Sequence, residues 1–149
     1  MKEFIKECQT QVQNIANDIE LYADNAYKCP NCGEVHSMSD YEATQYYNSD
    51  YEVCYKCPNC GDEVIEYELE GMSVGEYFDD CLDIEYRVGS GREFRSVRIM
   101  VTCGGPNIYV DTASKSVELY WGSVEESHPL TAYAVAAIND YFSEMFECC

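Results

Sequence analysis

Residues 27–35 read YKCPNCGEV and residues 55–64 read YKCPNCGDEV, so one short motif occurs twice in this chain of 149 residues. Each copy contains a C-x2-C pair followed by a glycine, which permits the positive-φ bend that brings two thiols to one side of a turn. Two such turns facing each other supply four thiolates, the number that a tetrahedral structural zinc ion takes. The repeat therefore predicts a zinc site made of Cys29, Cys32, Cys57 and Cys60.

The residues around the two pairs leave some details of this site open. Twenty-four residues separate Cys32 from Cys57, somewhat more than the roughly 15–20 residues usual between two C-x2-C pairs, which indicates an insertion. Within it, Ser39 begins the sequence Ser-Asp-Tyr-Glu, the pattern of a capping box at the start of a short helix. His36 and Cys54 lie close to the pairs, and the sequence leaves open whether either contacts the metal. The alternative, a redox C-x-x-C motif, would not need two matched copies.

The two CPNCG motifs resemble the knuckles of zinc-ribbon proteins over residues 27–64. This resemblance implies a structural Zn²⁺ that holds the fold and takes no part in chemistry. It implies nothing about function, because zinc ribbons are scaffolds in unrelated contexts.

The remainder of the chain predicts an α+β fold in three segments that form one compact unit. Residues 1–26 are expected to be a helix, residues 27–64 the cysteine module, and residues 65–149 an antiparallel meander with a C-terminal helix. The first helix carries apolar residues at alternating spacings of three and four, which favours packing within the chain or, alternatively, a helix pair in a homodimer. These residues are Ile5, Cys8, Val12, Ile15, Ile19, Tyr22 and Ala26.

Several finer features of the last segment also follow from residue patterns. The alternation from Val64 to Glu70 predicts a half-buried strand. Inward positions on the following strands include Val97, Ile99, Val101 and Cys103, and Cys8 and Cys81 are likewise expected in the core. Thr131 is expected to cap the closing helix, which carries Val135, Ile138, Phe142 and Met145 on one face.

The chain is strongly acidic, with 28 Asp and Glu against 9 Lys and Arg, a formal net charge of -19. Such a charge repels nucleic acid and anionic membranes and attracts basic protein surfaces. Residues 62–85 contain ten carboxylates and no Lys or Arg. Tyrosines such as Tyr46, Tyr47 and Tyr51 lie near acidic residues, a combination suited to protein–protein contact.

The acidic stretch suggests a mimic of DNA. On one strand face, Glu66, Glu68 and Glu70 would recur every ~6.6–6.8 Å, close to twice the ~3.4 Å that separates phosphates along a DNA strand. We expect such a surface to compete for a partner's basic nucleic-acid channel, with Tyr67 or Tyr77 as an aromatic anchor. The predicted contact residues are Glu66, Glu68, Glu70, Tyr77, Asp79, Asp80 and Asp83.

A second resemblance points to the kind of partner. The stretch VTCGGPNIYVDTASKSVELY (residues 101–120) and the ending AINDYFSEMFE (residues 137–147) resemble small acidic proteins carried by bacteriophages and mobile elements, a group that includes anti-CRISPR inhibitors. This resemblance implies a cytoplasmic, non-enzymatic inhibitor of a host nuclease, such as a CRISPR effector. It supplies no catalytic residues.

Two other classes of function stay open. One is a zinc-ribbon adaptor in transcription or RNA handling, whose arginine-rich hairpin (Arg87, Arg92, Arg95, Arg98) touches nucleic acid. The other is a regulatory homodimer built on the first helix. We expect no enzyme, because no histidine pairs with a nucleophile at a recognisable spacing and no phosphate-binding loop is present. The start of the sequence lacks an apolar signal region and no window is apolar enough to span a membrane, so we expect a cytoplasmic protein.

Overall fold

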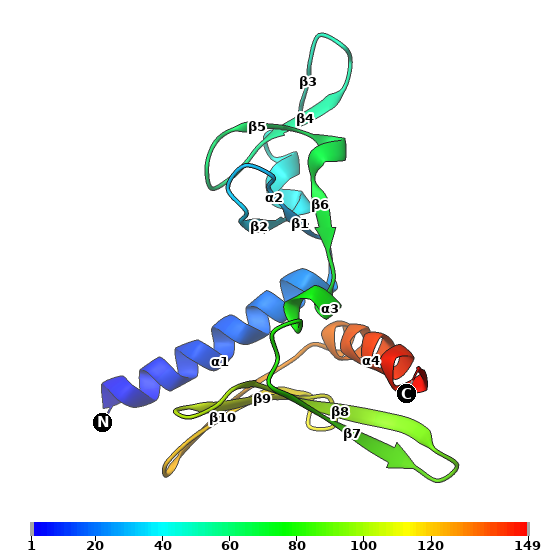
Figure 1. The fold of residues 1–149 in the computed structure, drawn as a ribbon. Helices are drawn as coiled ribbons and strands as arrows, with labels where there is room; N and C mark the ends of the chain where they lie inside the picture. The colour runs from blue at the N-terminus through cyan, green and yellow to red at the C-terminus, as the bar shows by residue number, and fades with distance from the viewer. Residues whose placement is uncertain (1, 149) are drawn as a thin grey trace. The chain divides into compact units, whose positions relative to one another are not determined.

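The computed structural model describes residues 2–148, which form two compact units (Figure 1). The smaller unit comprises residues 24–73 and contains both cysteine motifs. The larger unit combines residues 2–23 with residues 74–148. Helices and antiparallel sheets make up both units, which confirms the α+β class.

The larger unit is built on a five-stranded antiparallel meander in which each strand pairs with its sequence neighbours. Two long helices lie on one face of this sheet, α1 (Lys2–Ala23) and α4 (Ala132–Glu147), and the short helix α3 (Val74–Tyr77) packs beside them (Figure 1). In sequence order the strands are β7 (Asp83–Gly89), β8 (Glu93–Thr102), β9 (Asn107–Asp111), β10 (Ser116–Trp121) and β11 (Val124–Pro129).

The core of this unit lies between the sheet and its two helices. Ile99, Val110 and Val117 are direct cross-strand neighbours, and all three are fully buried. From the helices, α1 contributes Cys8, Val12, Ala16 and Ile19, and α4 contributes Ala134, Ile138 and Phe142. Of the predicted stripe of the first helix, Cys8, Val12 and Ile19 are therefore buried inside this unit, and Ile15 and Tyr22 are partly buried against the same core.

The structure corrects several boundaries and placements in this unit. Helix α1 ends at Ala23, and Ala26 begins a strand instead of continuing the helix. Cys103 is exposed, because β8 ends one residue before it, whereas Cys8 is buried as predicted. Met145 is exposed near the end of α4. Strand β11 was not predicted, because its Glu-Glu-Ser-His centre has no apolar alternation.

The predicted cap of the last helix is confirmed. Thr131 has an extended backbone, and its Oγ1 accepts a hydrogen bond from the Ala134 amide at 3.2 Å. Glu20 on α1 accepts hydrogen bonds from both the Thr131 amide (2.8 Å) and its hydroxyl (2.6 Å). One residue thus starts α4 and ties it to α1.

The smaller unit contains two three-stranded sheets made of very short strands. One has the order β2-β1-β6, from β2 (Val35–Ser37), β1 (Ala26–Lys28) and β6 (Glu70–Met72). The other has the order β3-β4-β5, from β3 (Tyr46–Tyr47), β4 (Val53–Lys56) and β5 (Glu63–Ile65). Residues 66–72 therefore belong to the cysteine-containing unit, since β6 pairs with β1 beside the first motif.

A short helix in this unit begins two residues earlier than the sequence suggested. Helix α2 spans Met38–Glu42, and its N-cap is Ser37, not Ser39. The Ser37 hydroxyl accepts a hydrogen bond from the Asp40 amide at 3.3 Å. Ser37 ends β2 and already has the extended backbone that an N-cap needs, so it takes the role.

Gly75 on α3 lies directly against the ring of Tyr141 on α4. It is buried in α3, and a Cβ atom added to it would overlap the ring of Tyr141 on α4. We expect Gly75→Ala to destabilise the larger unit by about 2 kcal/mol, because the ring must leave its place between α3 and α4. Thermal unfolding measures this loss, and the double variant Gly75→Ala/Tyr141→Ala should lose less than the sum of the two single changes. Additive losses would contradict the clash.

Candidate metal centre

Each cysteine motif forms the same turn between two adjacent strands, which makes the sequence repeat a structural repeat. In the first motif, which connects β1 to β2, the Cys29 amide donates to the Glu34 carbonyl and the Gly33 amide donates to the Cys29 carbonyl, both at 2.9 Å. In the second, which connects β4 to β5, Cys57 and Gly61 make the corresponding bonds at 3.0 and 2.9 Å. The two glycines have φ of +77° and +74°, so the left-handed bend predicted behind each second cysteine is present.

The two turns bring their thiols together. The Sγ atoms of Cys29, Cys32, Cys57 and Cys60 all lie within 4.8 Å of one another. Between the motifs, Cys29 Sγ lies 3.9 Å from Cys60 Sγ, and Cys32 Sγ lies 3.6 Å from Cys57 Sγ. A tetrahedral Zn²⁺ with Zn–S bonds of about 2.3 Å separates its sulfurs by about 3.8 Å. The four cysteines are therefore arranged to hold a metal ion, and their spacing fits the sulfur shell of zinc.

Burial and backbone amides adjust the acidity of these thiols. The pKa of Cys32 is lowered to about 7. The largest cause is a backbone hydrogen bond at Glu34, and the second is a hydrogen bond from the Asn59 side chain. Burial raises the pKa of the Cys29 thiol. At Cys60 the Asp62 amide lowers the pKa, but desolvation and the neighbouring thiols outweigh it and raise the value to about 12. A cation placed among the thiols would stabilise all four as thiolates, which is the form that binds zinc.

The surroundings of the site are hydrophobic on one side and open on the other. Cys29 and Cys57 are buried with Tyr41, Tyr55 and Val64, the main apolar side chains at the centre of this unit. The Tyr41 hydroxyl donates to the Tyr27 carbonyl at 3.3 Å, and burial, reinforced by the four thiols, raises the pKa of Tyr41. Cys60 is exposed.

His36 and Cys54 lie outside the group of four thiols. Among residues 2–148, the only cluster of three or more potential ligand side chains is this group of four cysteines. Cys54 is buried on β4 and donates to the Glu52 carbonyl at 3.7 Å. His36 packs the edge of its ring against Tyr41, with the ring centres 5.9 Å apart. Neither belongs to the thiol cluster.

The predicted ladder of carboxylates is wrong. Glu66, Tyr67 and Glu68 form a 3-10 turn (η1, Glu66–Glu68), which is closed by the Leu69 amide donating to the Glu66 carbonyl at 3.2 Å. Glu70 begins β6, which belongs to the other small sheet. The chain must cross between the two sheets here, so the alternation in the sequence does not become one strand. All three carboxylates are exposed but share no strand face.

The other predicted contact residues lie in the larger unit, so the predicted contact set is divided between the units. Tyr77 is partly buried on α3, and its ring centre lies 5.1 Å from those of Tyr22 and Phe78, so it packs with the core. Asp79 and Asp80 are exposed in the segment that leads into β7, and Asp83, also exposed, is the first residue of that strand.

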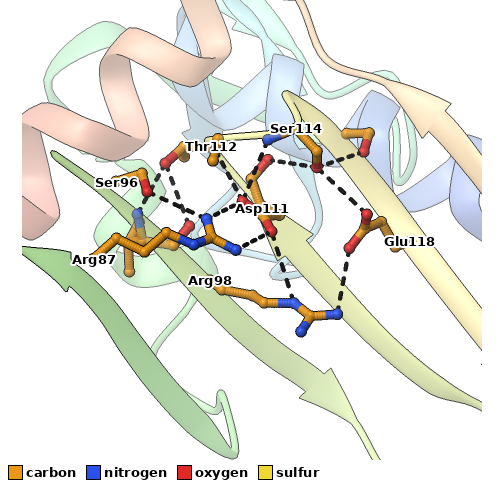
Figure 2. A network of polar contacts seen from close by, with 10 residues as sticks. Arg87, Ser96, Arg98, Asp111, Thr112, Ser114 and Glu118 are labelled. Carbon is orange, nitrogen blue, oxygen red and sulfur yellow. Dashed lines mark hydrogen bonds and ion pairs between the residues drawn. The ribbon is translucent and has the colours of Figure 1, made fainter.

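The arginine-rich hairpin contains a polar network that sequence reasoning missed. The Arg87 guanidinium donates to both carboxylate oxygens of Asp111, at 2.7 and 2.8 Å, and to the Ser96 hydroxyl at 3.2 Å (Figure 2). Arg98 lies 3.7 Å from Asp111 and 3.4 Å from Glu118 (Figure 2). Its guanidinium also lies 4.0 Å from the centre of the Tyr109 ring. Two of the four hairpin arginines are thus neutralised within the sheet.

Asp111 is the centre of this network. It is buried, and its Oδ1 also accepts from the Ala113 amide at 2.8 Å. The hydrogen bonds from Arg87 outweigh its burial and lower the pKa of the Asp111 carboxyl. The sequence did not single out Asp111, because it simply ends an alternating strand and its two arginine partners, Arg98 and Arg87, lie 13 and 24 residues away along the chain.

Comparison with known proteins adds no family to these observations. No known protein family, curated protein or solved structure matches the chain. The resemblance to phage-carried inhibitors therefore gains no support, and the metal centre is assigned from its geometry alone. Within residues 2–148, no helix is both long and apolar enough to cross a membrane.

The metal centre can be tested by spectroscopy. We expect the protein to bind one Co²⁺ in place of zinc and to show the strong visible absorption of a tetrahedral thiolate complex. Cys32→Ser should weaken that absorption and shift it, because one sulfur ligand is replaced by oxygen. Cys103→Ser should leave it unchanged, since Cys103 is exposed in the larger unit. An unchanged spectrum in Cys32→Ser would remove Cys32 from the site.

Proposed function

We propose that this protein is a zinc-stabilised, acidic interaction protein whose cysteine-containing unit binds a basic surface of a partner protein. One observation carries the proposal. Residues 24–73 contain eleven Asp and Glu against two Lys, and ten of the eleven carboxylates are exposed. A Zn²⁺ held by four thiolates would add two further negative charges. A small unit with this charge attracts basic surfaces over a distance set by ionic strength.

The partner that we propose is a protein that handles nucleic acid, for example a CRISPR effector nuclease or another defence enzyme. Such enzymes carry basic channels, which an acidic protein can occupy in competition with phosphates. Because η1 breaks the regular ladder of carboxylates, the proposed competition is electrostatic and does not depend on phosphate spacing. In this proposal the protein acts in the cytoplasm, where thiolates stay reduced, and has no catalytic role.

The rival proposal of a nucleic-acid adaptor has less to support it. The adaptor proposal depends on the positive charge of four arginines in one hairpin. Two of them are neutralised, because Arg87 forms an ion pair with Asp111 and Arg98 forms ion pairs with Asp111 and Glu118. Arg92 lies over the Phe146 ring, 5.6 Å from its centre. The hairpin therefore offers phosphates less free positive charge than the sequence suggested.

The proposed function is tested with a partner captured from bacterial lysate and then purified. We expect its affinity for the zinc-loaded chain to fall about tenfold or more between low and high salt, because exposed charges are screened. The triple variant Glu66→Lys/Glu68→Lys/Glu70→Lys should weaken binding. The matched control Asp140→Lys/Glu144→Lys/Glu147→Lys reverses three exposed carboxylates on α4 and should not. An affinity that is independent of salt would exclude the proposal.

A further inference from the structure

The tip of the β3–β4 hairpin presents a tyrosine in an unusual way. Tyr51 is 88% exposed, the largest exposed fraction among the large hydrophobic side chains of the described chain. Its φ is +63°, in the left-handed region that bulky side chains rarely adopt. Figure 1 shows the β3–β4 connection as a loop that extends beyond the strands it joins.

Asn48 holds this loop in one conformation. Its carbonyl accepts from the Tyr51 amide at 3.0 Å, and its Oδ1 accepts from the amides of Asp50 and Glu52, both at 2.9 Å. Its own amide donates to the Glu52 carbonyl at 3.1 Å, and its Nδ2 donates to Glu52 Oε1 at 3.3 Å. The backbone around Tyr51 is therefore fixed before any partner arrives.

The loop conformation favours glycine at the position that tyrosine occupies. A turn followed by one left-handed residue is a common hairpin loop, and glycine is the usual residue at the left-handed position. A bulky side chain held in the left-handed region at a solvent-exposed site is a candidate for function, because strained backbone clusters at ligand and partner sites. Tyr51 makes no compensating ring contact in the structure as described.

The neighbours of Tyr51 define which chemistry it could bind. Asp50 is exposed beside it, and Tyr47, on the strand that leads into the loop, is 64% exposed. An aromatic face next to carboxylates suits a guanidinium better than an ammonium, because a guanidinium stacks on the ring and donates two parallel hydrogen bonds to a carboxylate. The charge of the unit excludes phosphate and anionic lipid as occupants.

We propose that Tyr51 is the anchor of the docking surface, and that it stacks on an arginine side chain of a basic partner protein while Asp50 pairs with the same guanidinium. This inference rests on the proposed function and names the residues and the partner chemistry at that surface. A rigid aromatic side chain on a fixed loop loses little conformational entropy on binding, which is the property of interface hot spots.

The test is a titration of the zinc-loaded full chain with oligoarginine and oligolysine peptides of equal length, followed by NMR. We expect the arginine peptide to bind about two- to fivefold more tightly, because a guanidinium stacks on the ring and pairs with the carboxylate better than an ammonium does, and to shift the Tyr51 ring resonances. Tyr51→Gly should abolish this preference without unfolding the hairpin, because glycine suits the left-handed position. Asp50→Asn should reduce it.

The matched control is Tyr133→Ala, which removes a tyrosine of 61% exposure from α4 and should leave the arginine preference unchanged. Equal affinity for both peptides, or an unchanged preference in Tyr51→Gly, would overturn this inference. If both peptides still bind in a salt-dependent way, the proposed function survives that result. If neither peptide binds at low salt, the proposed function fails with it.

Discussion

Chelation of zinc is expected to unfold residues 24–73 and to leave the larger unit folded. The smaller unit has strands of two to four residues, and its buried centre is formed by Tyr41, Tyr55 and Val64 together with cysteines. A unit of this size buries too little apolar surface to offset the entropy of ordering its chain, so it needs a further stabilising element. Zinc bound by four thiolates supplies about 10–16 kcal/mol, which exceeds the stability of most small domains.

The two units can be followed separately by spectroscopy. Trp121 is the only tryptophan of the chain, and it packs against Phe4 in the larger unit, with the ring centres 4.6 Å apart. Its fluorescence should stay unchanged on chelation. Amide resonances of residues 24–73 should collapse to the narrow range of an unfolded chain and return when zinc is added back.

Variants separate loss of metal from other effects of the chelator. Cys57→Ser should show the unfolded resonances even with zinc present, because Cys57 is a buried member of the site. Cys54→Ser should still respond to zinc, since Cys54 lies outside the thiol cluster. Well-dispersed resonances of residues 24–73 in the metal-free protein would show that the fold does not depend on metal.

Asp111→Ala is expected to destabilise the larger unit by about 3 kcal/mol, the lower end of the range for removing one partner of a buried ion pair. The change leaves Arg87 and Arg98 without their shared carboxylate and the Ala113 amide without its acceptor. The value belongs at the lower end because Arg87 is 40% exposed, so water partly replaces the lost carboxylate.

Urea unfolding followed by Trp121 fluorescence measures this loss. Glu118→Ala is the matched control: it removes a carboxylate that contacts Arg98 alone among the arginines, at 3.4 Å, and should cost about 1 kcal/mol or less. Equal losses in the two variants would show that neither the burial of Asp111 nor its two hydrogen bonds from Arg87 contribute additional stability.

The same network predicts a dependence of stability on acid. The pKa of Asp111 is lowered in the folded state, so its contribution is complete above the unfolded value of about 3.9 and is lost as the pH falls through the lower folded value. Asp111→Ala should therefore lose less stability than the unaltered protein as the pH falls below about 4. Parallel losses in both proteins would assign the acid sensitivity to other carboxylates.

The sequence by itself determined the metal site and the order of the main helices and sheet. The repeated CPNCG motif specified four thiols and two left-handed glycines, because the geometry of a C-x2-C turn is local and needs no information from distant residues. Three of the four buried positions on each of α1 and α4 followed from their apolar spacing, as did the Thr131 cap.

Only the tertiary structure decided which charged side chains lie together and which of them form ion pairs. The alternation at residues 64–70 predicted one strand, but the chain turns at Glu66–Glu68 to reach a second sheet, since pairing partners outweigh local alternation. The ion pair of Arg87 on β7 with Asp111 on β9 reaches across β8, which lies between those two strands in the sheet. Such features depend on which residues the fold brings together, a property that no single segment of the sequence contains.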